Sequence, residues 1–363
     1  MSAKPFSAGG HDDPDTVAAY VAAADRRADE RLATAMADIF LAERHRLDER
    51  TRIAILRMTE ATVTALEREI AGHAARLLVA RGLDDVAGIL TANRTMTLDR
   101  LIEAGVLRDS EVMGEIIAQA RIDLIDAALI ANRMPGTTAA LLGRLAESGD
   151  GVVRTRAVAY LVADGRRRLP AAERRAELPG ELYYRLAWWI AAALRERLGA
   201  VQADGAIDRA LVEATQRSIA AYDEGERVEA VAAQLAGAID ATPADMPRLL
   251  LEALVEGRSI LFSALLARAL AVEPGDARAL MLDGDSDRLW LALRALAFAR
   301  EDMARIGWLL SEADAARDAE RLADALDPVA ALSPDTAALV VAPLAMPRDY
   351  RAALRTLART RAS

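Results

Sequence analysis

Apolar residues recur at helical spacing through almost the whole of this 363-residue chain, and no stretch shows the sustained alternation of a β-strand. The best strand candidate is 338–346 (ALVVAPLAM), but it contains Pro343, which cannot donate to a sheet ladder. The apolar residues are largely alanine and leucine, and aromatic residues make up only 4% of the chain. Such a core suits close helix packing better than sheets, so the sequence predicts an all-α fold.

Helix start signals divide the chain into many short helices. Thr242 and Ser333 each offer an N-cap followed directly by a proline at the first helical position. Asp13 and Pro14 repeat this pattern before the first long helix. We expect helices near 17–47, 48–82, 83–91, 96–104, 109–133, 138–148, 150–164, 180–198, 205–222, 225–239, 243–256, 258–271, 275–282, 286–299, 301–313, 317–325, 334–342 and 347–360.

The order of long and short helices predicts the domain organisation. Residues 1–12 form a disordered tail, and 13–82 form a long N-terminal antiparallel helical hairpin. The regions 83–240 and 241–363 are expected to be HEAT-like helix pairs stacked as an α-solenoid. We also expect the hairpin to form a symmetric dimer as a four-helix bundle. One apolar stripe runs along its second helix: Ile53, Leu56, Val63, Leu66, Ile70, His73, Leu77 and Leu78.

Two stretches resemble an uncharacterised alphaproteobacterial family with HEAT-like helical repeats. DERTRIAILRMTEATVTALEREIAGHAARLLVARG (48–82) is similar to its N-terminal signature. LLEALVEGRSILFSALLARALAVEPGDARALMLDGDSDRLWLALRALAF (250–298), with Gly257 and Phe262, is similar to its C-terminal signature. Residues 165–240 depart most from the family's pattern. The resemblance implies stacked helices, and it implies neither a biochemical function nor site residues.

Charge and cysteine content narrow the classes of function. The net charge is −9 and the chain has no cysteine, which excludes disulfides and thiolate chemistry. A globally acidic protein is a poor nucleic-acid binder. The start, MSAKPFSAGGHDDPD, has no apolar region typical of a secretory signal, and no apolar run reaches the roughly 20 residues of a membrane span. We therefore expect a soluble, cytoplasmic protein.

The sequence contains no recognisable catalytic, cofactor or metal motif. DGDSD (283–287) resembles the start of a calcium loop, but Arg288 and Arg294 stand where an EF-hand needs glycine and glutamate. We interpret it as an N-cap cluster. The chain has three histidines, and His73 on the apolar stripe is expected to be a hydrogen-bonded core or interface residue.

The role of one pair of acidic residues remains open. Asp123 and Asp126 are three residues apart and share a helix face near Arg121. Such a pair could do acid–base chemistry in a cleft, but we favour a solvated or repeat-bridging face.

Four of the 14 aromatic residues lie in LYYRLAWWI (182–190). A helical projection puts Tyr184 and Trp188 together on one face, beside a core stripe that includes Trp189. Either this face packs internally or it binds a partner. Internal packing, which we favour, would make Trp188→Ala cost about 3–5 kcal/mol, and a partner surface less than about 1 kcal/mol.

The helix expected at 347–360 has a basic and an apolar side. Its basic side consists of Arg348, Arg351, Arg355 and Arg359, which fall within an arc of about 80°. Its apolar side consists of Tyr350, Ala353, Leu354 and Leu357, which we expect to dock on the preceding helices. The arginines form either a solvated face or a docking strip for an acidic or phosphate-bearing partner.

These patterns favour a non-enzymatic helical-repeat scaffold or regulatory adaptor that binds another protein. Its candidate partner-binding residues are Tyr184, Trp188 and the four arginines of the basic side. The alternative is a small-molecule sensor or enzyme with an interhelical pocket near Trp188, Trp290 or Trp308. A deep pocket with convergent polar groups would favour the alternative. Nucleic-acid binding through local arginines is a third class of function, which the negative net charge of the chain opposes.

Overall fold

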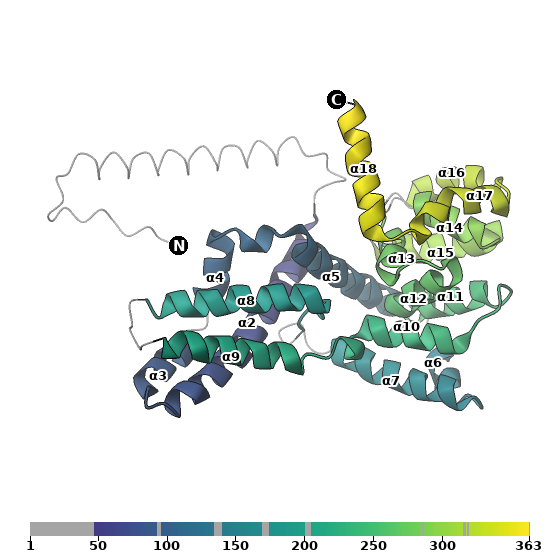
Figure 1. Ribbon diagram of the computed structural model, residues 1–363. Helices are drawn as coiled ribbons and strands as arrows, with labels where there is room; N and C mark the ends of the chain where they lie inside the picture. The colour runs from purple at the N-terminus through teal and green to yellow at the C-terminus, as the bar shows by residue number, and fades with distance from the viewer. Residues whose placement is uncertain are drawn as a thin grey trace. The chain divides into compact units, whose positions relative to one another are not determined.

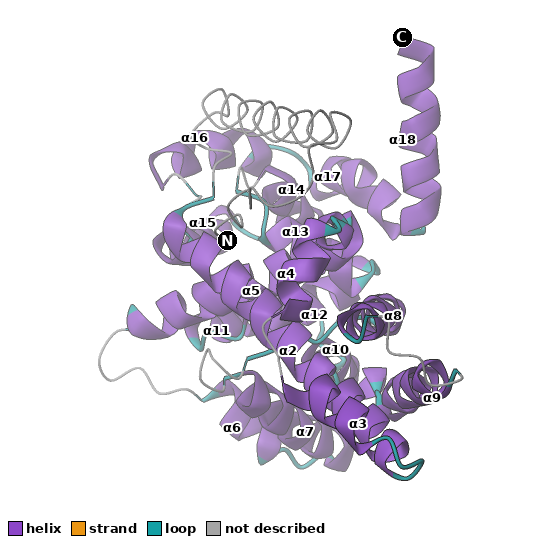
Figure 2. Cartoon of the chain, turned by 90° about the vertical axis from the view of Figure 1, so that its left-hand side faces the viewer, coloured by secondary structure: helices purple, strands orange, loops and turns teal. Residues whose placement is uncertain are grey.

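The computed structural model describes residues 47–92, 96–133, 140–168, 174–199, 205–284, 287–314, 317 and 319–362. The chain divides into two compact units, Met1–Asp48 and Glu49–Ser363, and every described element belongs to the second. All secondary-structure elements in the described part of the chain are helices, with no strand (Figure 2). The all-α prediction is therefore confirmed for these residues.

Most helices follow one another with short connections, and the longest lies between α7 and α8 (Figure 1). Their bounds are α2 Glu49–Val79, α3 Asp84–Ala92, α4 Met96–Glu103, η2 Val106–Arg108, α5 Ser110–Ala131, α6 Leu141–Ala146, α7 Gly151–Arg167, α8 Gly180–Arg197, α9 Ala206–Ala221, η3 Glu224–Glu226, α10 Val228–Ile239, α11 Met246–Val255, α12 Ser259–Leu270, α13 Pro274–Met281, α14 Asp287–Ala295, α15 Arg300–Ala313, α16 Ala319–Ala330, α17 Pro334–Val341, η4 Ala342–Ala345 and α18 Arg348–Ala362.

Every helix expected from residue 48 onward is present within a few residues of its predicted bounds. The largest differences lie at 138–148, where α6 is only Leu141–Ala146, and at 317–325, where α16 continues through Pro328 to Ala330. The strand candidate at 338–346 is the end of α17 followed by η4. The first arm of the predicted hairpin, 17–47, and the tail lie outside the described residues.

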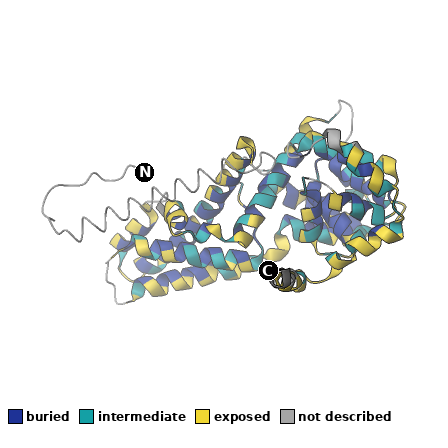
Figure 3. Ribbon diagram, turned by 90° about the horizontal axis from the view of Figure 1, so that it is seen from above, coloured by how far each residue is buried: buried dark blue, intermediate teal, exposed yellow. Residues whose placement is uncertain are grey.

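The buried side chains form two apolar clusters. The first cluster draws on α2, α3, α4, α8 and α9, and the second on α6, α7 and α10 to α16. Helix α5 contributes to both, because Ile116 and Ala120 lie in the first cluster while Ile122 and Ile125 lie in the second. Blue buried faces turn inward along most of these helices (Figure 3). A single helix thus joins the two halves of the core.

Helix α2 lies at the centre of the first cluster, packed against α3, α5, α8 and α9. From Val63 onward four residues of the predicted stripe are buried and two, His73 and Leu77, are half-buried. Earlier in the helix Ile53 and Leu56 are exposed, and Ile55 and Met58 are buried in their place. The prediction for the first two turns was wrong by part of a turn. The physical reason is that several helices pack around α2, so its buried face is wider than one stripe.

Some packed helices are far apart in the sequence. Helix α2 packs against α9, and α5 packs against α15, whereas α6 with α7, α11 with α12 and α12 with α13 are pairs of neighbours. In a regular solenoid each repeat contacts only its neighbours. The fold therefore contains contacts between helices that are distant in the sequence, in addition to the pairs of neighbouring helices that the sequence predicted.

No single helix in the described part of the chain is long and apolar enough to cross a membrane. Two segments are long and apolar enough to cross a membrane only when they are taken together: Asp324–Ala330 and Pro334–Ala345. They are bent by 108° relative to each other.

Candidate functional site

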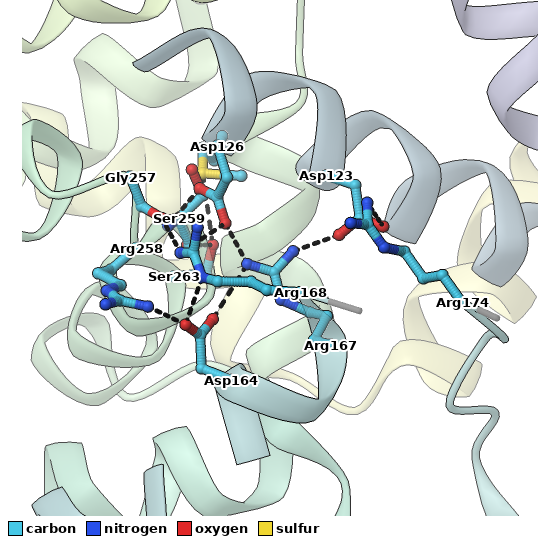
Figure 4. A network of polar contacts seen from close by, with 11 residues as sticks. Asp123, Asp126, Asp164, Arg167, Arg168, Arg174, Gly257, Arg258, Ser259 and Ser263 are labelled. Carbon is cyan, nitrogen blue, oxygen red and sulfur yellow. Dashed lines mark hydrogen bonds and ion pairs between the residues drawn. The ribbon is translucent and has the colours of Figure 1, made fainter. Parts of the chain in front are cut away.

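Charged side chains lie buried where the two apolar clusters meet along α5. Asp123 and Asp126, on successive turns of α5, both bind the guanidinium of Arg167 at the end of α7 (Figure 4). Arg167 also lies 3.2 Å from the Asp164 carboxylate, and Arg174 donates to Asp123 at 3.0 Å. The acidic pair is therefore a buried bridge between helices. The contacts support the bridging alternative as a bridge between helices, while a solvated face is excluded by the burial of both aspartates.

The same network holds the turn between α11 and α12. The Asp126 carboxylate accepts from the Ser259 backbone N–H at 2.9 Å, and Arg168 donates to the Gly257 carbonyl at 2.6 Å. Arg258 binds Asp164, and Figure 4 shows these groups converging from three elements. Gly257 has a positive φ of 63°, and a Cβ there would come within 2.7 Å of Ile130 Cγ1. This position requires glycine.

Burial and pairing act in opposite directions on the acids of this interface. Burial raises the pKa of Asp123, although Arg167 and Arg174 lower it. At Glu115, also on α5, burial opposes ionisation as well, but the hydrogen bond and charge of Arg278 outweigh it and the pKa is lowered. Arg278 donates to Glu115 at 2.5 Å and binds Glu229 of α10. A second buried ion-pair network therefore ties α5 to α13 and α10.

An irregular segment, 174–179, runs between the helices at this interface, and we call it the strap. Thr62 of α2 accepts from the Ala176 N–H at 2.8 Å, and Gln119 of α5 binds both backbone groups of Glu177, each at 2.9 Å. The Glu177 carboxylate in turn accepts from the Val228 N–H at 2.6 Å. Side chains thus replace the hydrogen bonds that a helix would supply, which lets non-helical backbone lie inside the fold.

A pocket of about 490 Å³ opens between the strap and its neighbouring helices. Its walls come from α2, α5, α7, α8, α9 and α10 together with the strap, and we call it the seam pocket. This volume falls within the range of about 300–1,000 Å³ typical of small-molecule sites, which often lie where two core regions meet.

Tyrosines, a serine and a glutamate form a linked polar wall in the seam pocket. The Tyr183 and Tyr222 rings stack with centroids 3.9 Å apart. The Tyr183 hydroxyl lies 3.0 Å from the Ser218 hydroxyl, which donates to Glu69 at 2.6 Å. Burial raises the pKa of Tyr183, the Ser218 hydrogen bond lowers it, Glu69 raises it and Arg175 lowers it. Glu69 and Arg175 therefore act in opposite directions on the pKa of the Tyr183 hydroxyl.

Arg175 differs from the other arginines that line this pocket. Its side chain is exposed, and no ion pair or hydrogen bond joins it to another described residue. The other lining arginines are engaged: Arg166 binds Glu226, Arg227 binds Glu229, and Arg167 and Arg174 bind Asp123. The pocket therefore presents a guanidinium, a carboxylate and hydroxyls to a ligand of mixed polarity.

The predicted aromatic pair lies elsewhere on α8. Tyr184 is 53% exposed, Trp188 is half-buried, and their rings meet edge to face at a centroid distance of 6.0 Å. Internal packing is wrong for Tyr184, because the pair lies beside the core stripe of Leu186 and Ile190 and not within it. The stacked pair that lines the pocket, Tyr183 with Tyr222, was not predicted.

The basic side of α18 is not a free strip. Arg348 is exposed, but Arg351 binds Asp276 of α13, so the strip is interrupted by a contact that the sequence did not suggest. The side chains of Arg355 and Arg359 lie outside what the structure describes. The apolar side does not dock as expected, since Tyr350, Leu354 and Leu357 are 55%, 45% and 63% exposed. The Arg351 ion pair holds the helix by its polar side instead.

The three tryptophans named for an alternative pocket have different surroundings. Trp290 is fully buried against Gly307, where a Cβ would come within 2.8 Å of the Trp290 ring. Trp308 lines an open apolar hollow with Leu251 and Leu322. The lining of the seam pocket includes none of the three.

The described residues contain no group of three or more potential metal-binding side chains. Asp285 of the DGDSD stretch lies outside them, as do His11 and His45. The Nδ1 of His73 accepts from the Arg76 guanidinium at 2.6 Å, which confirms that His73 is hydrogen-bonded, and its side chain is half-buried. Burial and the nearby Arg76 and Arg217 lower its pKa.

The residues missed by the sequence prediction come from separate segments. Glu69, Arg175, Tyr183, Ser218 and Tyr222 lie on three helices, the strap and a helix end. No spacing pattern links them. The only available signal was the RRAEL segment, a charged non-helical stretch between two strongly helical regions.

Comparison with known proteins gives one family match. Residues 170–342 match a family described as "Uncharacterised protein conserved in bacteria (DUF2336)". The match contains 250–298, as the resemblance implied, but not 48–82, and it includes most of 165–240, where we expected the greatest departure. Neither the curated proteins nor the solved structures contain a match to the chain. The segment that supplies the strap and most of the second cluster is therefore similar to a conserved bacterial domain of unknown function.

Proposed function

We propose that the protein is a non-enzymatic regulatory adaptor that binds a small zwitterionic ligand in the seam pocket. The supporting observation is the set of polar groups that line the pocket with Tyr183: the exposed Arg175 guanidinium and the hydrogen-bonded Glu69–Ser218 pair. An acidic group of the ligand would pair with Arg175, and a cationic or donor group would meet Glu69. The stacked rings of Tyr183 and Tyr222 offer a flat apolar wall.

The position of the pocket suggests how binding could regulate. The strap joins α7 to α8, so it links the second cluster to the first, and its backbone is held by Thr62 and Gln119. A ligand that contacts the strap would bind the ordered arrangement better than a loosened one and would stabilise it. In this proposal the α6–α13 helix pairs form the HEAT-like scaffold that carries the change to a partner.

Two matched substitutions test the pocket. Ala221 and Ala220 are adjacent, exposed residues of α9, and Ala221 belongs to the pocket lining whereas Ala220 does not. The probes are the free amino acids, added singly in a thermal-shift measurement. We expect at least one to raise the melting temperature of the wild type and of Ala220→Trp, but not of Ala221→Trp. At about 100 times Kd the ligand should contribute about 2.7 kcal/mol of stability.

Arg175→Gln supplies the second arm of the test. The substitution removes the positive charge and breaks no ion pair with another described residue, so we expect an unchanged melting temperature in the absence of ligand. We expect the affinity for the ligand to fall at least about tenfold. If no amino acid stabilises the wild type, or if Ala221→Trp responds as the wild type does, the proposal is wrong.

A second candidate function is protein binding through the Tyr184–Trp188 pair, which the exposure of Tyr184 favours. Exposed aromatic residues of this kind are enriched at interfaces and carry much of the binding energy there. Tyr184→Ala should change the free energy of unfolding by less than about 1 kcal/mol. The test is cross-linking of the wild type and Tyr184→Ala in cell extract: loss of one discrete cross-linked product in the variant would support this function, and identical products would contradict it.

A further inference from the structure

Helix α18 presents its apolar side outward. Tyr350, Leu354 and Leu357 lie on one side of the helix at i, i+4 and i+7, and each is about half exposed or more. Figure 1 shows α18 extending away from the neighbouring helices α13 and α17. An amphipathic helix in a globular protein normally turns this side to the core.

An ion pair fixes this inverted orientation. Arg351 on the other side of α18 binds Asp276 of α13, and both side chains are nearly buried, at 13% and 14% exposure. Arg351 also donates from Nε to the Met346 carbonyl at 3.0 Å, at the start of the helix. The polar side is therefore held against the body of the second cluster, and the apolar side cannot face it at the same time.

The apolar exposure continues into the segment before α18. Leu339 and Val340 at the end of α17 are 77% and 55% exposed, and Met346 between η4 and α18 is 42% exposed. Six large apolar side chains within 339–357 are thus accessible in the described structure. Scattered single residues of this kind are common on protein surfaces, but such a local concentration marks an interaction site.

The charge of α18 contrasts with that of the whole chain. The helix carries five arginines and one aspartate, a net charge of +4, on a chain whose net charge is −9. The helical spacing places Arg348, Arg351, Arg355 and Arg359 opposite the large apolar residues. High amphipathicity, low overall hydropathy and such a separation of arginines from apolar residues are the properties of helices that lie in the plane of a membrane surface. Anionic headgroups attract such a basic segment.

We propose that α18 docks on an anionic lipid surface, with Tyr350, Leu354 and Leu357 inserted among the upper acyl chains. In this proposal the exposed Arg348 and the net positive charge of the helix pair with the lipid phosphates. Long arginine stems can extend along a bilayer while the guanidinium groups stay at the headgroups. The proposal concerns peripheral binding and does not depend on the seam pocket.

A second copy of the chain fits this surface less well. Pairing of two α18 helices would bring two net charges of +4 together. The helix also offers only three large apolar side chains over about two heptads, far less than a stable dimer interface requires. An acidic protein would satisfy the arginines but would leave the apolar side exposed.

Vesicle flotation of the full chain tests the proposal. The probes are vesicles of phosphatidylcholine alone and vesicles of phosphatidylcholine mixed equally with phosphatidylglycerol. We expect the wild type to float with the mixed vesicles and to remain unbound with the neutral ones. Raising the salt concentration should release it, because exposed charges are screened over about 8 Å at physiological ionic strength.

Two variants separate the apolar and the electrostatic contributions. Leu354→Asp with Leu357→Asp, and Arg355→Glu with Arg359→Glu, should each lower vesicle binding at least about tenfold. Val212→Asp, which alters an exposed apolar residue of α9, should bind as the wild type does. Circular dichroism melts should be the same for all four proteins, which excludes unfolding as the cause.

Three outcomes would overturn the proposal. The first is a wild type that does not float with anionic vesicles. The second is equal flotation with neutral vesicles, which would remove the role of the arginines. The third is undiminished binding by the double leucine variant. A dimer in light scattering that the leucine variant abolishes, without vesicle binding, would assign the surface to a second copy instead.

Discussion

Gly257 lies where the chain turns from α11 into α12, and its backbone conformation leaves no room for a side chain. A Cβ would clash with Ile130 and with the Asp126 carbonyl at 2.9 Å, and the positive φ adds strain. Gly257→Ala should therefore lower the free energy of unfolding by about 2–4 kcal/mol in a urea melt. Gly88→Ala, in open space on helix α3, is the control and should stabilise by up to about 1 kcal/mol. Equal effects of the two substitutions would contradict this account of the turn.

Arg167 is the second residue whose loss should be costly. It neutralises Asp123 and Asp126 and approaches Asp164, and all three carboxylates are buried. Arg167→Met would leave buried acids without their main partner, so we expect a loss of about 3–5 kcal/mol in the free energy of unfolding. Arg52→Met removes an exposed pair with Glu49 at 3.9 Å and should change it by less than about 0.5 kcal/mol. A loss below about 1 kcal/mol for Arg167→Met would show that the network is dispensable.

At the scale of elements, α5 depends on its N-cap. The Asp109 carboxylate accepts from the backbone N–H groups of Glu111 and Val112 at 3.0 and 2.9 Å. The Val112 hydrogen bond is the main cause that lowers the pKa of Asp109, and Arg185 adds to it. Asp109→Ala should cost about 1 kcal/mol at neutral pH, measured in a denaturant melt.

The pH dependence of this cap has a defined sign. Because the folded-state pKa of Asp109 lies below its unfolded-state value, its stabilisation is complete above about pH 4 and is lost as the pH falls through the folded-state pKa. Asp109→Asn keeps a capping oxygen but cannot titrate. Its free energy of unfolding should therefore fall less steeply than that of the wild type below about pH 4. Parallel curves for the two proteins would contradict the assignment.

At the scale of the whole molecule, one helix belongs to both apolar clusters. Because α5 packs in each, and the networks of Arg167 and Arg278 cross between them, the clusters should unfold together. Two single-tryptophan variants can report on the unfolding of each cluster separately. Each variant keeps one of the four tryptophans and carries phenylalanine at the other three tryptophan positions. Trp189 then reports on the first cluster and Trp290 on the second. In each variant, fluorescence and circular dichroism should give one coincident urea transition, and two separated transitions would show independent clusters.

The sequence by itself determined the secondary structure of this protein. Alanine-rich helical periodicity, caps such as Ser333 and the turn at Gly257 act over a few residues, so local physics was sufficient to place the helices. It also determined that Asp123 and Asp126 share a face. Which group that face meets depends on Arg167, some 40 positions away, and local patterns carry no such information.

Only the tertiary structure decided where the helices' faces point and which groups share a pocket. Glu69, Arg175 and Tyr183 gather because α2, the strap and α8 pack together, and that arrangement minimises the free energy of the whole core. The orientation of α18 shows the same principle. Its amphipathic pattern alone favoured docking by the apolar side, but one buried ion pair, Arg351 with Asp276, holds it by the polar side. A pairing between distant charges overrode a local preference, and only the packed structure contains that contact.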